Sequence, residues 1–346
     1  MTPTRSRCPS VCGCASRIAQ LHTISPVNAL FTLLAVVPLL LLIVLANLAE
    51  RAPTMRTPLL LFLGMLNLAT LLTGASAAAT LDQESRFGAL VLILGSGLGG
   101  AVLHPDVRRT LARGFNLRAE SALDLTALSL TFWALGVNLF QALVLSPRLF
   151  AVAQSPEIQL QLQLQQSYLD ILVFPLLTFL LAAFLGVGLY TRRTQDEVLR
   201  RLGFERPSWR DALTALLITP GLIGLAFLTE AVWRVVDPSG LEQVGSLSEL
   251  LLGDLQGVPG ALAIGIAGAL GEEVFFRGAY QPRMGILLTA LLFTSFHTQY
   301  GITLATALVF VIGVVLGLVR RYRSLNAAIA VHFFYNVVLV LLNPVG

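Results

Sequence analysis

Lysine is absent from this chain of 346 residues, so each of the 23 basic residues is an arginine. Its absence excludes a Schiff-base lysine and the lysine that clamps phosphate in nucleotide-binding loops. Charge is also scarce: 12% of the residues are charged, against roughly 25% in an ordinary soluble domain. With 55% hydrophobic residues, the composition predicts a polytopic membrane protein and leaves no stretch for a separate soluble domain.

Cysteine is confined to Cys8, Cys12 and Cys14, near the amino terminus. These thiols lack a fourth zinc ligand at a suitable spacing, and no apolar stretch precedes Cys14 that would make it a lipoprotein cleavage site. The pattern implies no disulfide framework, and we expect residues 1–26 to form a mobile tail.

Long apolar runs recur from residue 27 to the carboxyl end. A hydrocarbon core of ~30 Å needs about 20 residues of helix. The sequence therefore predicts an all-α polytopic membrane helix bundle with about eight to ten transmembrane helices. A short stretch, 158–164, alternates leucine or isoleucine with glutamine and favours a strand or an interfacial extension. The ten apolar runs are 27–49, 57–80, 87–103, 123–145, 171–190, 212–236, 258–277, 285–297, 302–319 and 325–342.

Arginines concentrate in the stretches 104–122, 191–211 and 320–323. Each stretch follows an odd-numbered run, so all three are expected on one side, which the positive-inside rule makes cytoplasmic. The stretches 146–170 and 237–257 would then face outward. Because the arginines are scattered among short loops and form no single binding face, we expect the lipid bilayer, and not nucleic acid, as the partner of this composition.

Closely spaced glycines occur in two of the apolar runs. Gly95, Gly97 and Gly100 match a dinucleotide-binding fingerprint, and Glu120 falls at the spacing of a ribose-binding acid. That motif requires a strand, a turn and a helix, whereas this run reads as a membrane helix, so we interpret Gly95 and Gly99 as helix-packing residues. The glycines at 313 and 317 receive the same interpretation.

Adjacent carboxylates interrupt the apolar stretch 258–276. Glu272 and Glu273 lie side by side, and Arg277 follows the second one by four residues. Ionisable groups at membrane depth are costly and usually mark a site with partners. Glu273 and Arg277 share a helical face and can pair, which leaves Glu272 without a local cation and makes it a candidate general base.

Two of the four histidines also lie in or at the end of apolar runs. His297 ends the eighth run, and His332 lies four residues before Asn336 in the tenth, so His332 and Asn336 share a helical face. A lone histidine on an apolar helix is usually a packing residue. Polar groups from three helices together instead predict one shared wet pocket.

These segments resemble the CPBP family, the CAAX proteases and bacteriocin-processing enzymes, also called the Abi family. The resemblance covers about 212–346, expected to form the catalytic membrane core, while 27–211 would supply additional amino-terminal helices. Its three motifs are Glu-Glu-x-x-x-Arg, Phe-x-x-x-His and His-x-x-x-Asn, here Glu272, Glu273 and Arg277, then Phe293 and His297, then His332 and Asn336.

The resemblance implies an intramembrane endopeptidase that activates water. Glu272 would be the base, assisted by His297, while His332 and Asn336 would stabilise the oxyanion. Glu273 and Arg277 would orient the helix and tune Glu272. We expect no cofactor, although a Glu, His, His cluster could also hold zinc with an open water position.

The substrate would be a peptide or a membrane-associated protein, and the arginine-only, short-looped chain favours a bacterial plasma membrane. Prenylated substrates of eukaryotic relatives do not transfer to this chain, and the sequence does not indicate an oligomeric state. Two alternatives remain open: a non-proteolytic scaffold or immunity protein of the same fold, and a proton-coupled transporter. The transporter is less favoured because the two halves show no matching pair of interrupted helices.

Overall fold

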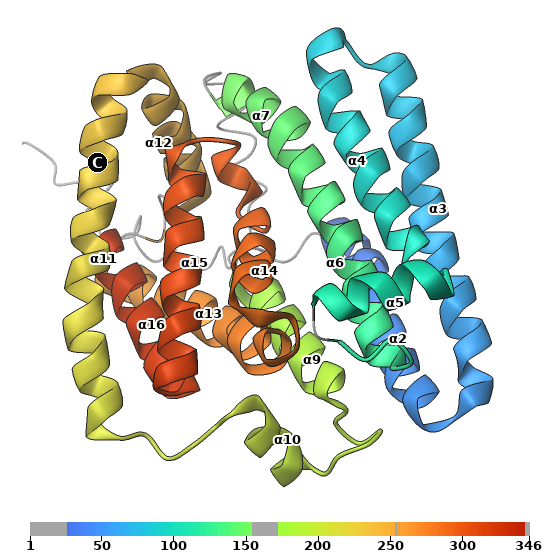
Figure 1. Ribbon diagram of the computed structural model, residues 1–346. Helices are drawn as coiled ribbons and strands as arrows, with labels where there is room; N and C mark the ends of the chain where they lie inside the picture. Colours follow the sequence, from blue (N-terminus) through green and yellow to red (C-terminus); the bar gives the residue numbers. More distant parts are fainter. Residues whose placement is uncertain (1–25, 116, 154–171, 253–254, 256, 343–346) are drawn as a thin grey trace, which may run out of the picture.

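The computed structural model describes residues 26–342 except 116, 154–171, 253–254 and 256. This described part forms a helical bundle without a β-strand, so the predicted all-α class is confirmed (Figure 1). The stretch 158–164 and the three cysteines lie outside the described residues.

The elements fall into an amino-terminal and a carboxy-terminal series. The first comprises α2 (Pro26–Arg51), η1 (Pro53–Met55), α3 (Arg56–Thr80), α4 (Gln83–Ala101), α5 (Pro105–Gly114), α6 (Ala122–Phe140), the π-helix η2 (Gln141–Leu145), α7 (Ser146–Ala153) and α9 (Phe174–Val187). The second comprises α10 (Gln195–Leu202), α11 (Trp209–Val236), α12 (Pro238–Leu252), α13 (Gly257–Glu273), the π-helix η5 (Val274–Tyr280), α14 (Gln281–Ser295), η6 (Thr298–Tyr300), α15 (Leu304–Tyr322) and α16 (Leu325–Leu342).

Six helical segments of the described part are long and apolar enough to cross a membrane, or seven if α4 and α5, bent by 101°, count as one span. The protein is therefore a multi-pass membrane protein, but the predicted count of eight to ten is not confirmed. One of the six is the 39-residue segment Gly257–Ser295, roughly 58 Å of helix at 1.5 Å per residue. It is broken at Gly285 (φ 76°, ψ 174°), so two of the predicted runs are its two arms.

Helices of each series pack mainly on one another (Figure 1). In the first, α3 packs on α4 and α4 packs on α6. In the second, α13 and α11 both pack on α16, and α14 packs on α15. Helix α9 contacts α13 and α2, so it lies between the two series.

Small residues allow the closest helix contacts. A Cβ atom on Gly95 would lie 2.8 Å from the backbone nitrogen of Gly136, and one on Gly99 would lie 2.9 Å from the carbonyl oxygen of Ser129. A Cβ on Gly313 would lie 3.2 Å from the Phe293 ring. The interpretation of these glycines as helix-packing residues is confirmed, and the described part has no strand that a dinucleotide-binding motif would need.

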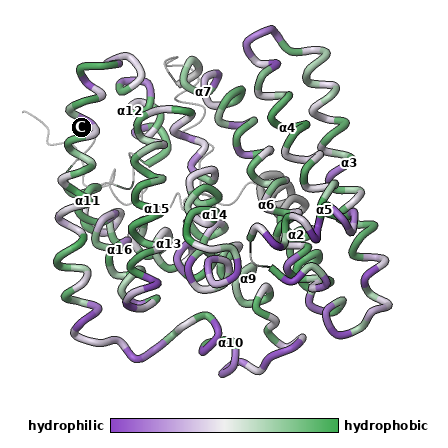
Figure 2. Tube along the Cα trace, viewed as in Figure 1, coloured by the Kyte–Doolittle hydropathy of each residue, from purple (hydrophilic) through white to green (hydrophobic). Residues whose placement is uncertain are grey.

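The three arginine-rich stretches meet at one end of the bundle. Arg51, in the last turn of α2, donates to the carbonyl oxygen of Arg192 at 3.3 Å, and its neighbour Glu50 lies 3.6 Å from Arg118. Arg320 donates to the carbonyl oxygen of Leu202 at 3.3 Å. Hydrophilic residues gather along α10 and at α5 (Figure 2). We call this end of the bundle the basic end. Its cytoplasmic location remains a prediction.

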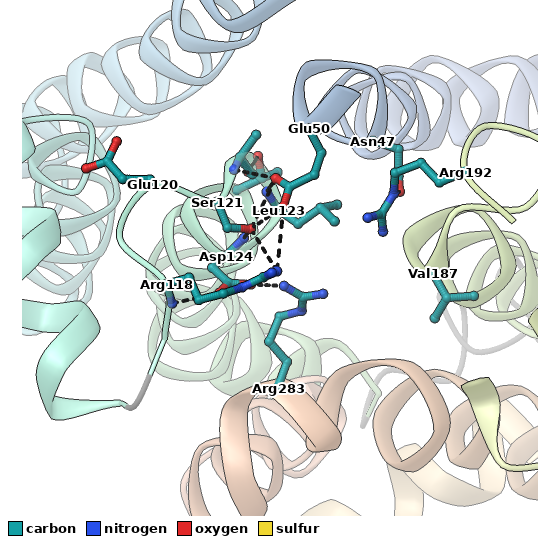
Figure 3. A network of polar contacts seen from close by, with 12 residues as sticks. Asn47, Glu50, Arg118, Glu120, Ser121, Leu123, Asp124, Val187, Arg192 and Arg283 are labelled. Carbon is teal, nitrogen blue, oxygen red and sulfur yellow. Dashed lines mark hydrogen bonds and ion pairs between the residues drawn. The ribbon is translucent and has the colours of Figure 1, made fainter. Parts of the chain in front are cut away.

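A polar network at the basic end joins the two series (Figure 3). Glu50 of α2 accepts a hydrogen bond from Ser121, the residue before α6, at 3.1 Å. The Arg118 guanidinium lies 3.5 Å from Asp124 of α6, and Arg283 of α14 pairs with the same carboxylate. Arg283 precedes the break at Gly285, so this network fixes the segment that leads from η5 into α14.

Candidate active site

The two adjacent glutamates have different surroundings. They are the last residues of α13, and the π-helix η5 follows them. A π-turn is wider than an α-turn and often occurs at functional sites. Glu273 is completely buried, whereas Glu272 is partly exposed and lines a cavity. One carboxylate can therefore meet a substrate, while the other is held within the protein.

Glu273 forms the ion pair that its spacing predicts. The Nε atom of Arg277 lies 3.3 Å from Glu273 Oε2, and both side chains are fully buried. Arg277 also donates to the carbonyl oxygen of Gly313 at 3.2 Å, and its guanidinium carbon lies 4.6 Å from the centre of the Phe293 ring. These contacts fasten η5 to α14 and α15.

The other oxygen of Glu273 contacts the last motif. The Nδ1 atom of His332 lies 2.9 Å from Glu273 Oε1. An ionised carboxylate only accepts, so the proton of this bond lies on Nδ1 and the Nε2 atom is left for another partner. Glu273 thus links Arg277 to His332 and fixes the ring orientation, as an acid does in a catalytic triad.

His297 is oriented by its own helix end. Its Nδ1 atom lies 3.0 Å from the carbonyl oxygen of Phe293. A carbonyl oxygen only accepts, so Nδ1 carries the proton, and Nε2 of the neutral ring is an acceptor. The ring centre lies 4.8 Å from that of Phe293 and 6.1 Å from that of Tyr300, whose plane is nearly parallel to it.

A cavity of about 460 Å³ brings the remaining predicted residues together. Glu272, His297, His332 and Asn336 all line it, whereas Glu273 and Arg277 lie behind its wall. Most of its other lining is apolar, as expected of a ligand site. The Oε2 atom of Glu272 is buried without a hydrogen-bond partner, so part of this carboxylate is unsatisfied in the protein alone.

Asn336 is placed by a close helix contact. A Cβ atom on Gly268 of α13 would lie 3.0 Å from its Nδ2 atom, so glycine at 268 leaves the space that the amide occupies. His332 and Asn336 both face the cavity from α16, in agreement with their spacing.

Sequence reasoning did not select two further lining residues. Tyr300 lies beside His297, and burial raises the pKa of its phenol, which keeps the hydroxyl protonated. Glu230 of α11 lines the cavity far along the chain from the motifs. A carboxylate within the apolar run 212–236 was a signal that could have identified Glu230.

The donor side chains of the site are not arranged as a metal centre. Among the residues that the structure describes, no group of three His, Cys, Asp or Glu side chains is arranged to hold a metal ion. One nitrogen of His332 and one of His297 are already engaged by Glu273 and a carbonyl oxygen.

Comparison with known proteins gives one match, in the carboxy-terminal part. Residues 254–338 match the family model described as Rce1-like, type II CAAX prenyl endopeptidase Rce1-like. This segment contains all three motifs, so the predicted resemblance to the CPBP family is confirmed over it, and the match indicates a CAAX protease-like peptidase. No curated protein and no solved structure matches the chain significantly.

Proposed function

We propose that the protein is an intramembrane endopeptidase that hydrolyses a peptide bond with water activated by Glu272 and His297. One observation carries this proposal: an unsatisfied carboxylate, two imidazoles and an amide line a single cavity between apolar helices. Apolar surroundings strengthen electrostatic interactions among such groups.

In this mechanism, Glu272 takes a proton from water while the water oxygen attacks the carbonyl carbon of the substrate. His297 assists by accepting a hydrogen bond from the same water at Nε2. The tetrahedral intermediate then breaks at the C–N bond, and the leaving amine takes the proton held by Glu272. The water supplies both the new carboxyl oxygen and the protons, so no other reactant is needed.

His332 and Asn336 stabilise the negative oxygen of the intermediate. The Nδ2 atom of Asn336 is a donor, and His332 donates from Nε2 when its ring is protonated. Glu273 at 2.9 Å stabilises an imidazolium that forms during the reaction. Glu273 and Arg277 are therefore positioning residues, which act through His332 and not on the substrate.

The steps above need no metal ion. Zinc held by Glu272, His297 and His332 is the competing version, in which the metal would polarise the water and the carbonyl. A chelator distinguishes the versions, because the metal-independent reaction keeps its rate after prolonged dialysis against a chelator.

The setting that we propose is a bacterial plasma membrane with the basic end in the cytoplasm. The substrate is a peptide or a membrane-associated protein whose cleavage site reaches the cavity. The apolar helices and the arginines gathered at one end support this setting.

The test uses purified protein in lipid nanodiscs and a peptide library read by mass spectrometry. Glu272→Gln and His297→Ala should each lower cleavage by 10²-fold or more, on the order of what a general base contributes. Glu120→Gln and His104→Ala change the same residue types at exposed positions and should leave the rate unchanged. Undiminished cleavage by both site variants would refute the proposed base and its assistant.

A further inference from the structure

The cavity extends well beyond the groups assigned to catalysis. Glu230 of α11 lines it together with Ala226 and Phe227, whereas the catalytic residues are on α13, α16 and the end of α14. Glu230 is the remaining carboxylate of the lining, and its side chain is 32% exposed. The proposed hydrolysis makes no use of this acid.

The separation of Glu230 from the catalytic residues follows from the pairing of α11 with α16. The hydroxyl of Thr219 in α11 donates a hydrogen bond to the carbonyl oxygen of Val331 at 3.5 Å. Thr219 therefore lies at the same level of the bundle as His332, the residue after Val331. Glu230 follows Thr219 by eleven residues, roughly 16 Å further along a helix. The carboxylate is therefore near the end of the bundle opposite the basic end.

The length of the path sets the number of residues that can follow it. An extended chain rises about 3.3 Å per residue, so about five residues span the roughly 16 Å from the level of His332 to Glu230.

The charge along this path is negative. Glu230 and Glu272 both line the cavity, and no arginine lines it among the described residues. Such a field concentrates cations at the mouth of the cavity and repels anions.

The present partner of Glu230 is weak. Arg234, one helical turn later, pairs with it at 2.5 Å but is 69% exposed. Exposed pairs within one helix contribute little, because water screens them and the long side chain loses freedom. A cation that enters through the cavity can therefore replace Arg234 while remaining less exposed to water.

We propose that Glu230 is the distal anchor of a substrate subsite, which selects peptides with a cationic group about five residues from the scissile bond. The group is a basic side chain or a free amino terminus, bound to the carboxylate of Glu230 while the intervening apolar residues occupy the cavity. This inference rests on the proposed peptidase function.

The experiment measures both binding and cleavage by the protein in nanodiscs. The probes are decapeptides with an apolar centre, in matched pairs with arginine or the uncharged citrulline at one position, each with a free or an acetylated amino terminus. For wild type, we expect arginine to be preferred over citrulline by about tenfold in Kd and in kcat/KM at the optimal position, the factor that 1.4 kcal/mol gives. The acetylated set distinguishes a side-chain cation from a terminal amine.

Variants test whether Glu230 causes the preference for arginine over citrulline peptides. Glu230→Gln should abolish it, and Glu230→Asp should retain most of it, which controls for misfolding. Arg234→Gln should increase binding of the arginine peptides severalfold, because it removes the guanidinium that competes with the peptide for Glu230. Glu242→Gln makes the same charge change at an exposed position of α12 and should leave the preference intact.

The outcomes separate this inference from the proposed function. If the protein cleaves the peptides but binds arginine and citrulline peptides with equal Kd, the inference is overturned and the proposed peptidase function is not affected. A preference in binding without any cleavage would support the subsite and count against the peptidase. Binding of no peptide, or a preference that survives Glu230→Gln, would also overturn the inference.

Discussion

The buried ion pair behind the active site gives a quantitative prediction. Arg277→Met leaves the carboxylate of Glu273 in the interior with His332 as its remaining partner. Removal of one member of a buried ion pair costs about 3–5 kcal/mol, because the other charge is left without compensation. The variant also loses the hydrogen bond to Gly313 and the contact with the Phe293 ring, each worth on the order of 1 kcal/mol.

The second half of this prediction is a double-mutant cycle. Glu273→Gln alone leaves Arg277 as the uncompensated charge and should cost a similar amount. Together, Glu273→Gln and Arg277→Met remove both charges, so the double variant should be more stable than the sum of the single changes predicts by about 2 kcal/mol or more. The assay is reversible unfolding of the purified protein by SDS, followed by far-UV circular dichroism.

The matched control is Arg109→Met, which breaks an exposed pair with Asp106 and should change the stability much less. If the stability loss of the double variant equals the sum of the two single losses, the reasoning is refuted, because the two buried charges then do not compensate each other. An Arg277→Met protein as stable as wild type would refute it as well.

Three further predictions concern packing and the active site. Gly95→Val should lower the stability by several kcal/mol because α4 and α6 touch at this residue, whereas Gly97→Val, which faces open space, should not; SDS unfolding measures both. Gly268→Ala should displace the Asn336 amide and lower kcat with little change in KM, while Gly224→Ala, also in open space, should keep the wild-type rate. Dialysis against a chelator should leave the cleavage rate unchanged, and loss of activity with recovery on addition of zinc would favour the metal version.

The local parts of the site followed from the sequence because they depend on helical periodicity. Four-residue spacing predicted that Glu273 pairs with Arg277 and that His332 and Asn336 share a face, and both hold in the structure. The bond between Glu273 and His332 joins groups 59 residues apart. No local pattern encodes such a contact, since it depends on how α13 packs against α16.

The helix count was less predictable for a physical reason. Hydropathy detects apolar stretches but not bends. The break at Gly285 and the bend between α4 and α5 could therefore not be predicted, and both change how many runs count as separate spans. Glu230 is a different case: its carboxylate was visible in the apolar run 212–236, but only the shared cavity connects it with His332. Single charges become informative once their neighbours in space are known.

The most direct test of the central claim is whether Glu272 and His297 act as one unit on a water molecule. Cleavage rates would be measured for wild type, Glu272→Gln, His297→Ala and the double variant under the same conditions. The account predicts that each single variant loses 10²-fold or more and that the double variant loses little beyond the worse single one, as residues acting together do. Independent, multiplicative losses, or a double variant that still cleaves at the wild-type rate, would contradict it.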